Sequence, residues 1–144
     1  MLKEKSKLSI AAAELLQDQE YYPSSVHCSY FSCFQLLKFS LSDFFGLSEA
    51  DFSAIEREAK QKAKDLGREW REGSHQFLIN YVIKEIEKNY NSDISGDISD
   101  RINLLKKYRV ESDYMAIPID INKSKKAYYM AKQIHEDLKE ILHV

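Results

Sequence analysis

The chain has 144 residues, of which 44% are hydrophobic, enough for one domain with a packed core and too few for two ordinary domains. Its formal net charge is -2, from 21 basic and 23 acidic residues, which excludes a strong overall positive field and leaves a local basic patch open. Four Gly and two Pro residues are too few to punctuate many short strands. The composition therefore predicts a single all-α domain over residues 1–144.

The first two predicted helices carry many of the apolar residues. The first has an apolar stripe at helical spacing and ends near residues 17–20. The second begins near Pro23, which suits a first helical position, and stops near Gly46. Its apolar residues cover more than one face: Val26, Tyr30, Phe31, Cys33, Phe34, Leu37, Leu41, Phe44 and Phe45. We expect this helix to lie at the centre of the domain.

The wide apolar surface of the second helix also predicts a homodimer, because Tyr30, Phe31 and Phe34 are aromatic anchors of the kind enriched at interfaces. The N-terminal stretch "MLKEKSKLSI" is charged and lacks the apolar core of a secretion signal. The apolar stretch that follows Tyr21 is interrupted by charged residues, so we expect no membrane insertion. These features predict a cytoplasmic protein.

Residues 48–73 are rich in charges and form either a peripheral helix or an insertion. Ser48 can cap a helix with Asp51 three residues on, and apolar residues recur at helical spacing as far as Leu66. Basic residues gather around Trp70, an arrangement that suits phosphate contacts beside a stacking ring. Acidic residues alternate with them, so the pattern favours a solvated helix.

Three further helices complete a predicted bundle of about five helices, with residues 48–73 at its periphery. One begins near His75, with Ser74 as its cap, and the next continues to about Tyr114. A last helix follows, with Asp120 or Asn122 as its cap. The remaining histidines of that segment are expected on a solvated face: His135 and His143.

Polar residues interrupt the apolar stripe near the end of the penultimate helix. Counted in steps of three and four from Leu105, the inward side continues through Arg109 and Asp113. His75 starts the inward side of the preceding helix, and the short turn between the two helices predicts antiparallel packing. We therefore predict that His75, Arg109 and Asp113 form a polar cluster, with Tyr114 adjacent.

Two interpretations of this cluster stay open. Arg109 and Asp113 are four residues apart and can simply pair on the helix, where a cation near the C-terminal end is favourable. Because buried charges are costly unless paired, such a network can be purely structural, or it can be a functional site. No metal site is predicted: His27 beside Cys28 does not point two ligands the same way, and the chain has no further cysteine pair for zinc. We predict no cofactor.

Three stretches resemble the HEPN family, the higher eukaryotes and prokaryotes nucleotide-binding domains. They are "AAAELLQDQEYYPSSVHCSYFSCFQLLKFSL", "GSHQFLINY" and "YRVESDY", which are similar to the opening helices, the short His-led helix and the Arg, three residues, Asp-Tyr signature of that family. They follow the family's order and span most of residues 8–142. The resemblance implies an up-and-down helical bundle, a homodimer, and nucleotidyltransferase partners or defence and toxin-antitoxin systems.

The resemblance leaves two classes of function open. The first is a binding or regulatory module, in which Asp113, Tyr114 and Tyr30 contribute to a site for a partner, a nucleotide or RNA. The second follows an HEPN branch that cleaves RNA without a metal, using an Arg followed four to six residues later by a His. Arg68 and His75 have six residues between them, although in that branch the motif lies late in the bundle. In this second class His75 moves the proton of an attacking ribose hydroxyl, and Arg109 or Arg68 stabilises the charged phosphorane.

Overall fold

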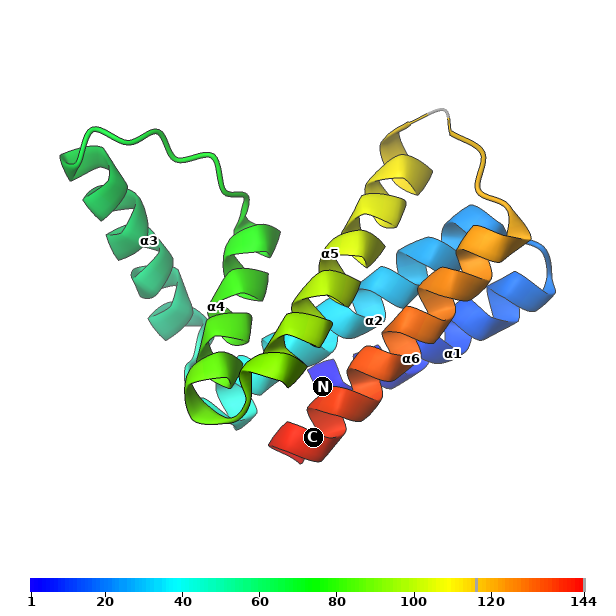
Figure 1. Ribbon diagram of the computed structural model, residues 1–144, viewed down its shortest axis with the longest axis horizontal. Helices are drawn as coiled ribbons and strands as arrows, with labels where there is room; N and C mark the ends of the chain where they lie inside the picture. Colours follow the sequence, from blue (N-terminus) through cyan, green and yellow to red (C-terminus); the bar gives the residue numbers. More distant parts are fainter. Residues whose placement is uncertain (116, 144) are drawn as a thin grey trace.

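The structure is a computed structural model that describes residues 1–115 and 117–143. These residues contain no strand and form six helices: α1 (Leu2–Asp18), α2 (Tyr22–Asp43), α3 (Glu49–Asp65), α4 (Ser74–Asn89), α5 (Ser92–Tyr114) and α6 (Ile121–Leu142) (Figure 1). The all-α prediction is confirmed. The predicted count of about five helices is one too low, because the charged segment forms a complete helix, α3. The predicted domain also included Ala116 and Val144, which lie outside the described residues.

Local capping chemistry starts several of the helices. The hydroxyl of Ser48 accepts the backbone N–H of Asp51 at 3.1 Å, and the Asp51 carboxylate accepts the Ser48 N–H at 3.0 Å, a complete capping box at α3. Of the two candidates at α6, Asp120 and not Asn122 is the cap, and its carboxylate accepts a backbone N–H at 2.8 Å. The expected cap at α4 is wrong, because Ser74 is the first helical residue and makes no capping hydrogen bond.

α2 lies at the centre of the bundle and packs against α1, α4, α5 and α6 (Figure 1). Ten of its residues are buried, and four of these are serines. Ser25 donates to the Ala13 carbonyl at 2.6 Å, so the small hydroxyl side chains let α1 approach closely and satisfy backbone acceptors. The largest fully buried side chains include Tyr30, Leu37, Ile79, Ile86, Ile98, Ile102, Leu105, Ile134 and Leu138.

The apolar circumference of α2 is covered within one chain. Tyr30 is fully buried, and Phe31 and Phe34 are half-buried. The homodimer predicted from this surface therefore needs a different contact, because Tyr30 cannot serve as an interface anchor. Within the described ranges, no helix combines the length and the apolar composition that crossing a membrane requires.

α3 lies at the edge of the molecule, away from α6 (Figure 1), and Leu2 at the start of α1 lines the same cavity as residues of α3. None of its residues is buried. It is held mainly by Phe52, whose ring centroid lies 5.5 Å from that of Phe77 and 5.4 Å from that of Tyr81, both on α4. The expected peripheral, mostly solvated helix is confirmed.

Candidate functional site

Arg109 lies inward near the C-terminal end of α5, where the apolar stripe places it. Its side chain is 16% exposed, and its Nε lies 3.0 Å from the Oδ2 of Asp113. The guanidinium carbon lies 5.6 Å from the ring centroid of Tyr30, 5.1 Å from that of Phe31 and 5.3 Å from that of Tyr114. One carboxylate and three aromatic faces therefore surround the positive charge, and aromatic faces attract cations.

Much of the hydrogen-bonding capacity of Arg109 is unused. Its Nε is buried and close to Asp113, but the N–H does not point at an acceptor among the described residues. Its Nη2 donates one long hydrogen bond, 3.4 Å, to the hydroxyl of Tyr114, whose side chain is 72% exposed. Its Nη1 donates none within residues 1–115 and 117–143 and, unlike Nε, is not buried. The two Nη groups are therefore open to an acceptor that arrives from solvent past Tyr114.

His75, in the first turn of α4, is held by two aromatic residues of α2. Its Nδ1 lies 3.0 Å from the hydroxyl oxygen of Tyr30, and its ring stacks on Phe34 with 4.0 Å between centroids. Burial lowers the pKa of His75 below its usual value of 6.5, and the positive charges of Arg109 and Lys106 act in the same direction. His75 is therefore neutral at pH 7.

Tyr30 connects His75 to Arg109. Its ring centroid lies 6.0 Å from that of His75, and burial raises the pKa of Tyr30 to about 12, so the hydroxyl keeps its proton. Within the described residues, hydrogen bonds and ion pairs join His75 to Tyr30 and not to Arg109, Asp113 or Tyr114. The residues of the predicted cluster are thus a chain of contacts in which Tyr30 is the buried link.

Sequence reasoning missed two polar members of the cluster. The Nδ1 of His27 on α2 lies 2.8 Å from the Oδ2 of Asp113, with the His27 side chain 44% exposed. Lys106 lies one helical turn before Arg109 on α5, and burial lowers its pKa. Helical spacing could have suggested Lys106, but only the packing of α2 against α5 shows that His27 meets a carboxylate.

Arg68 is the candidate that the structure does not bring into the cluster. It is exposed in the connection between α3 and α4, and its one hydrogen bond among the described residues runs from its backbone N–H to the Ala63 carbonyl at 2.8 Å. No described contact joins its side chain to His75. The nearby Trp70 packs on Phe77, with 5.6 Å between ring centroids.

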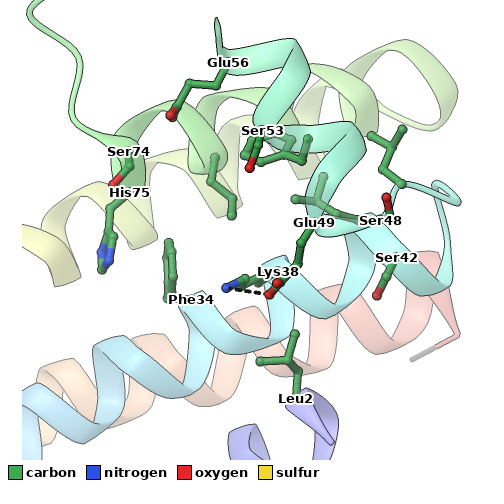
Figure 2. A pocket seen from close by; sticks show the side chains of 14 residues that line it. Leu2, Phe34, Lys38, Ser42, Ser48, Glu49, Ser53, Glu56, Ser74 and His75 are labelled. Atoms are coloured by element: carbon green, nitrogen blue, oxygen red, sulfur yellow. Dashed lines mark ion pairs between the residues drawn. The ribbon is translucent and has the colours of Figure 1, made fainter.

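A cavity of about 400 Å³ adjoins the cluster between α2, α3 and α4 (Figure 2). His75 and Phe34 form part of its wall, and Lys38 lies beside Phe34 on α2 and pairs with Glu49 of α3, with 3.5 Å between the charged atoms. The volume is in the range of small-molecule sites. His75 therefore faces the cavity while its Nδ1 contacts Tyr30.

Among the described residues, no group of three or more His, Cys, Asp and Glu side chains is placed to hold a metal ion. No family model, curated protein or solved structure matches the chain. The HEPN resemblance, and the roles it implies for these residues, therefore stay predictions.

Proposed function

We propose that this chain is an HEPN-like helical module that binds the phosphate groups of RNA or of a nucleotide at Arg109, beside Tyr30 and His75. The observation that carries the proposal is the pair of open Nη groups on a guanidinium whose position is already held. A guanidinium matches phosphate oxygens with two parallel hydrogen bonds, and a preorganised one loses little freedom on binding.

The charges around the site favour an anion. Asp113 balances Arg109 and orients it, while Lys106 and Lys38 add positive charge near His75. Lys38 is paired with Glu49, whereas Lys106 forms no ion pair among the described residues and donates to the Oε1 of Gln76 at 2.9 Å. Tyr114, exposed and stacked over Arg109, can move aside or stack on a base.

The test is the affinity for a short single-stranded RNA and for nucleoside triphosphates, measured by fluorescence anisotropy. Arg109→Gln should weaken binding by about tenfold or more, because it removes a charged hydrogen-bonding group. Arg101→Gln is the matched control: Arg101 lies on the same helix and pairs with Asp137 at 2.9 Å, so it removes the same charge from another site. Equal losses in the two variants would contradict the proposal.

As the biological setting of this site we propose action with a nucleotidyltransferase-type or defence-system partner, on the HEPN resemblance. Co-expression with a candidate nucleotidyltransferase, followed by co-purification, tests this part separately. Arg109→Gln should still fold and should fail to support the partner's activity.

A metal-independent endoribonuclease is the second candidate, and the lowered pKa of His75 favours it. When Nδ1 donates its proton to Tyr30, Nε2 has a lone pair that can take the proton of a ribose 2′-hydroxyl. The 2′-oxygen then attacks phosphorus and the 5′-oxygen leaves, taking a proton from water, to give a 2′,3′-cyclic phosphate and a 5′-hydroxyl. Arg109 would stabilise the charge on the phosphorane.

Cleavage should depend on unprotonated His75, so its rate should fall as the pH drops through the pKa of His75, which lies below 6.5. His75→Gln should abolish cleavage, whereas His143→Gln, at an exposed position after α6, should not. Arg68→Gln should also leave the rate unchanged. Cleavage of an RNA whose 2′-hydroxyls are replaced by hydrogen would rule out this chemistry.

The homodimer in this proposal rests on the HEPN resemblance and on the outer face of α1. Leu8 and Leu15 lie seven residues apart on that face and are 71% and 63% exposed. The first half of α1 is lysine-rich and the second carries Glu14 and Asp18, so two copies packed antiparallel would place opposite charges together. Light scattering should show a dimer for the unaltered chain and a monomer for Leu8→Ser with Leu15→Ser. A monomer at high micromolar concentration would count against it.

A further inference from the structure

A second groove, with no residue of the Arg109 cluster, lies between the first half of α1 and the second half of α6. Figure 1 shows the start of α1 and the end of α6 close together. The groove has a volume of about 370 Å³, in the range of small-molecule sites. Its polar lining is dominated by lysines from both helices: Lys3, Lys7, Lys132 and Lys139.

These four lysines have few anionic neighbours; one is Glu4, whose pKa is lowered by the N-terminal ammonium and also by Lys7. None of them forms an ion pair within residues 1–115 and 117–143, and Glu136 is the one carboxylate among the residues that line the groove. Four lysines line this small groove, and the Nζ of Lys132 lies 5.9 Å from the ring centroid of Tyr128, outside the lining. Their like charges repel one another, so an anion bound in the groove would be favoured. The groove is thus positive in a chain whose net charge is -2.

His135 forms part of the groove wall and is not the solvated residue that the sequence pattern predicted. Its Nε2 lies 3.1 Å from the Oγ of Ser32, and that hydroxyl already donates to the Ser29 carbonyl at 2.8 Å. His135 Nε2 must therefore carry the proton and donate to Ser32. Burial also lowers the pKa of His135 to about 4, so the ring is neutral at pH 7 and Nδ1 is left as an acceptor for a hydroxyl or a protonated phosphate oxygen.

The lysines lie on both sides of the groove at separations that suit more than one anionic group. Lys3 and Lys7 are one turn apart on α1, about 6 Å along the axis, and Lys132 and Lys139 are two turns apart on α6, about 10 Å. We propose that this groove binds a small molecule that carries at least two phosphate groups. The small volume and the absence of an overall positive charge favour such a ligand over a nucleic-acid chain, which would need an extended basic surface.

The experiment is a calorimetric titration of the whole chain with inorganic pyrophosphate at low ionic strength. Lys7→Gln with Lys139→Gln removes one groove lysine from each helix and should weaken binding by about tenfold or more. The control, Lys5→Gln with Lys125→Gln, removes the same charge from the same helices at exposed positions outside the groove and should change the affinity less than about twofold. Inorganic monophosphate should bind about tenfold more weakly than pyrophosphate.

Nuclear magnetic resonance of the histidine rings locates the site independently. Addition of pyrophosphate should shift the resonances of His135 in Arg109→Gln as well as in the unaltered chain, which separates this groove from the proposed phosphate site at Arg109. Glu136→Gln should tighten binding, because it removes the opposing carboxylate. No measurable binding, equal weakening in both double variants, or a response at His75 in place of His135 would overturn the proposal. Tighter binding of a short single-stranded RNA than of pyrophosphate, with the affinity for RNA lowered equally by both double variants, would also overturn it.

Discussion

α2 and α3 are both regular helices, of 22 and 17 residues, yet they hold opposite positions in the molecule. α2 has ten buried residues and contacts four other helices, whereas α3 has no buried residue and touches α4 through a few aromatic rings. The residues of α3 start and continue a helix without help: a complete capping box begins it, and Lys60 pairs with Glu56 one turn away at 3.5 Å.

α2, in contrast, has weak local helix signals. It contains six serines and several aromatic residues, which are weaker helix formers than the Ala, Glu and Lys of α3. Its stability therefore comes from burial on several sides, with the hydroxyls of Ser25, Ser32 and Ser40 bonded to backbone carbonyls. The comparison shows that local helix signals and a central place in the fold are separate properties of a sequence.

The largest effect is expected from a cavity in α2. Leu37 is fully buried, so Leu37→Ala should lower the free energy of unfolding by about 2 to 5 kcal/mol. Ile55 on α3 is only half-buried, and Ile55→Ala should cost less than about 1 kcal/mol. Urea unfolding monitored by circular dichroism measures both. Equal losses would show that α3 is as much a part of the core as α2.

Arg109 lies over the rings of Tyr30 and Phe31, near the middle of α2. Arg109→Ala should lower the free energy of unfolding by roughly 1 to 3 kcal/mol, because it removes the partner of Asp113 and the cation over the rings of Tyr30 and Phe31. Arg101→Ala, whose ion pair is more exposed, should cost less. Thermal or urea unfolding measures the loss of stability in both variants. Unchanged stability in Arg109→Ala would remove the structural interpretation and leave the functional one.

His135 on α6 is hydrogen-bonded to Ser32, one of the buried serines of α2, so its titration reports on that contact. Burial lowers the pKa of His135 from 6.5 to about 4, with Lys132 acting in the same direction. Between these values the unfolded chain binds the proton and the folded chain does not, so stability is full above about pH 6.5 and falls as the pH drops toward 4. His135→Gln should remove roughly 1 to 2 kcal/mol of that loss, allowing for partial exposure. The melting temperature is measured against pH for the unaltered chain and for His135→Gln, and identical profiles would contradict this prediction.

The smallest effect on global stability is expected from the cap of α3. Ser48→Ala removes one half of the capping box and should destabilise α3 locally by about 1 kcal/mol. Because α3 has few tertiary contacts, the change should appear as faster hydrogen exchange in residues 49–65, with amides in the buried part of α2 unaffected. A matching rise in exchange across α2 would show that the two helices unfold together.

Some features of the candidate site could be predicted from local sequence patterns, and others depend on how the helices pack. The inward position of Arg109 and its pairing with Asp113 followed from their spacing on one helix, although Asp113 itself is exposed. His75 was expected beside these two residues, and its described hydrogen bond joins it to Tyr30 instead. The contact of His27 with Asp113 and the bridge through Tyr30 did not follow, because each joins residues of α2 to a helix far along the chain. His135 was placed on a solvated face for the same reason: its partner Ser32 lies 103 residues away.

The sequence by itself determined the all-α class, the approximate extent of each helix, the central role of α2 and the peripheral one of α3. Periodicity and capping are local properties, and they suffice to form a helix and to mark its apolar side. Only the tertiary structure decided which helix covers each side of α2, that Tyr30 is buried and that the lysines of α1 and α6 share one groove. Those arrangements depend on side chains distant in sequence competing for the same buried surface, and no local pattern records that outcome.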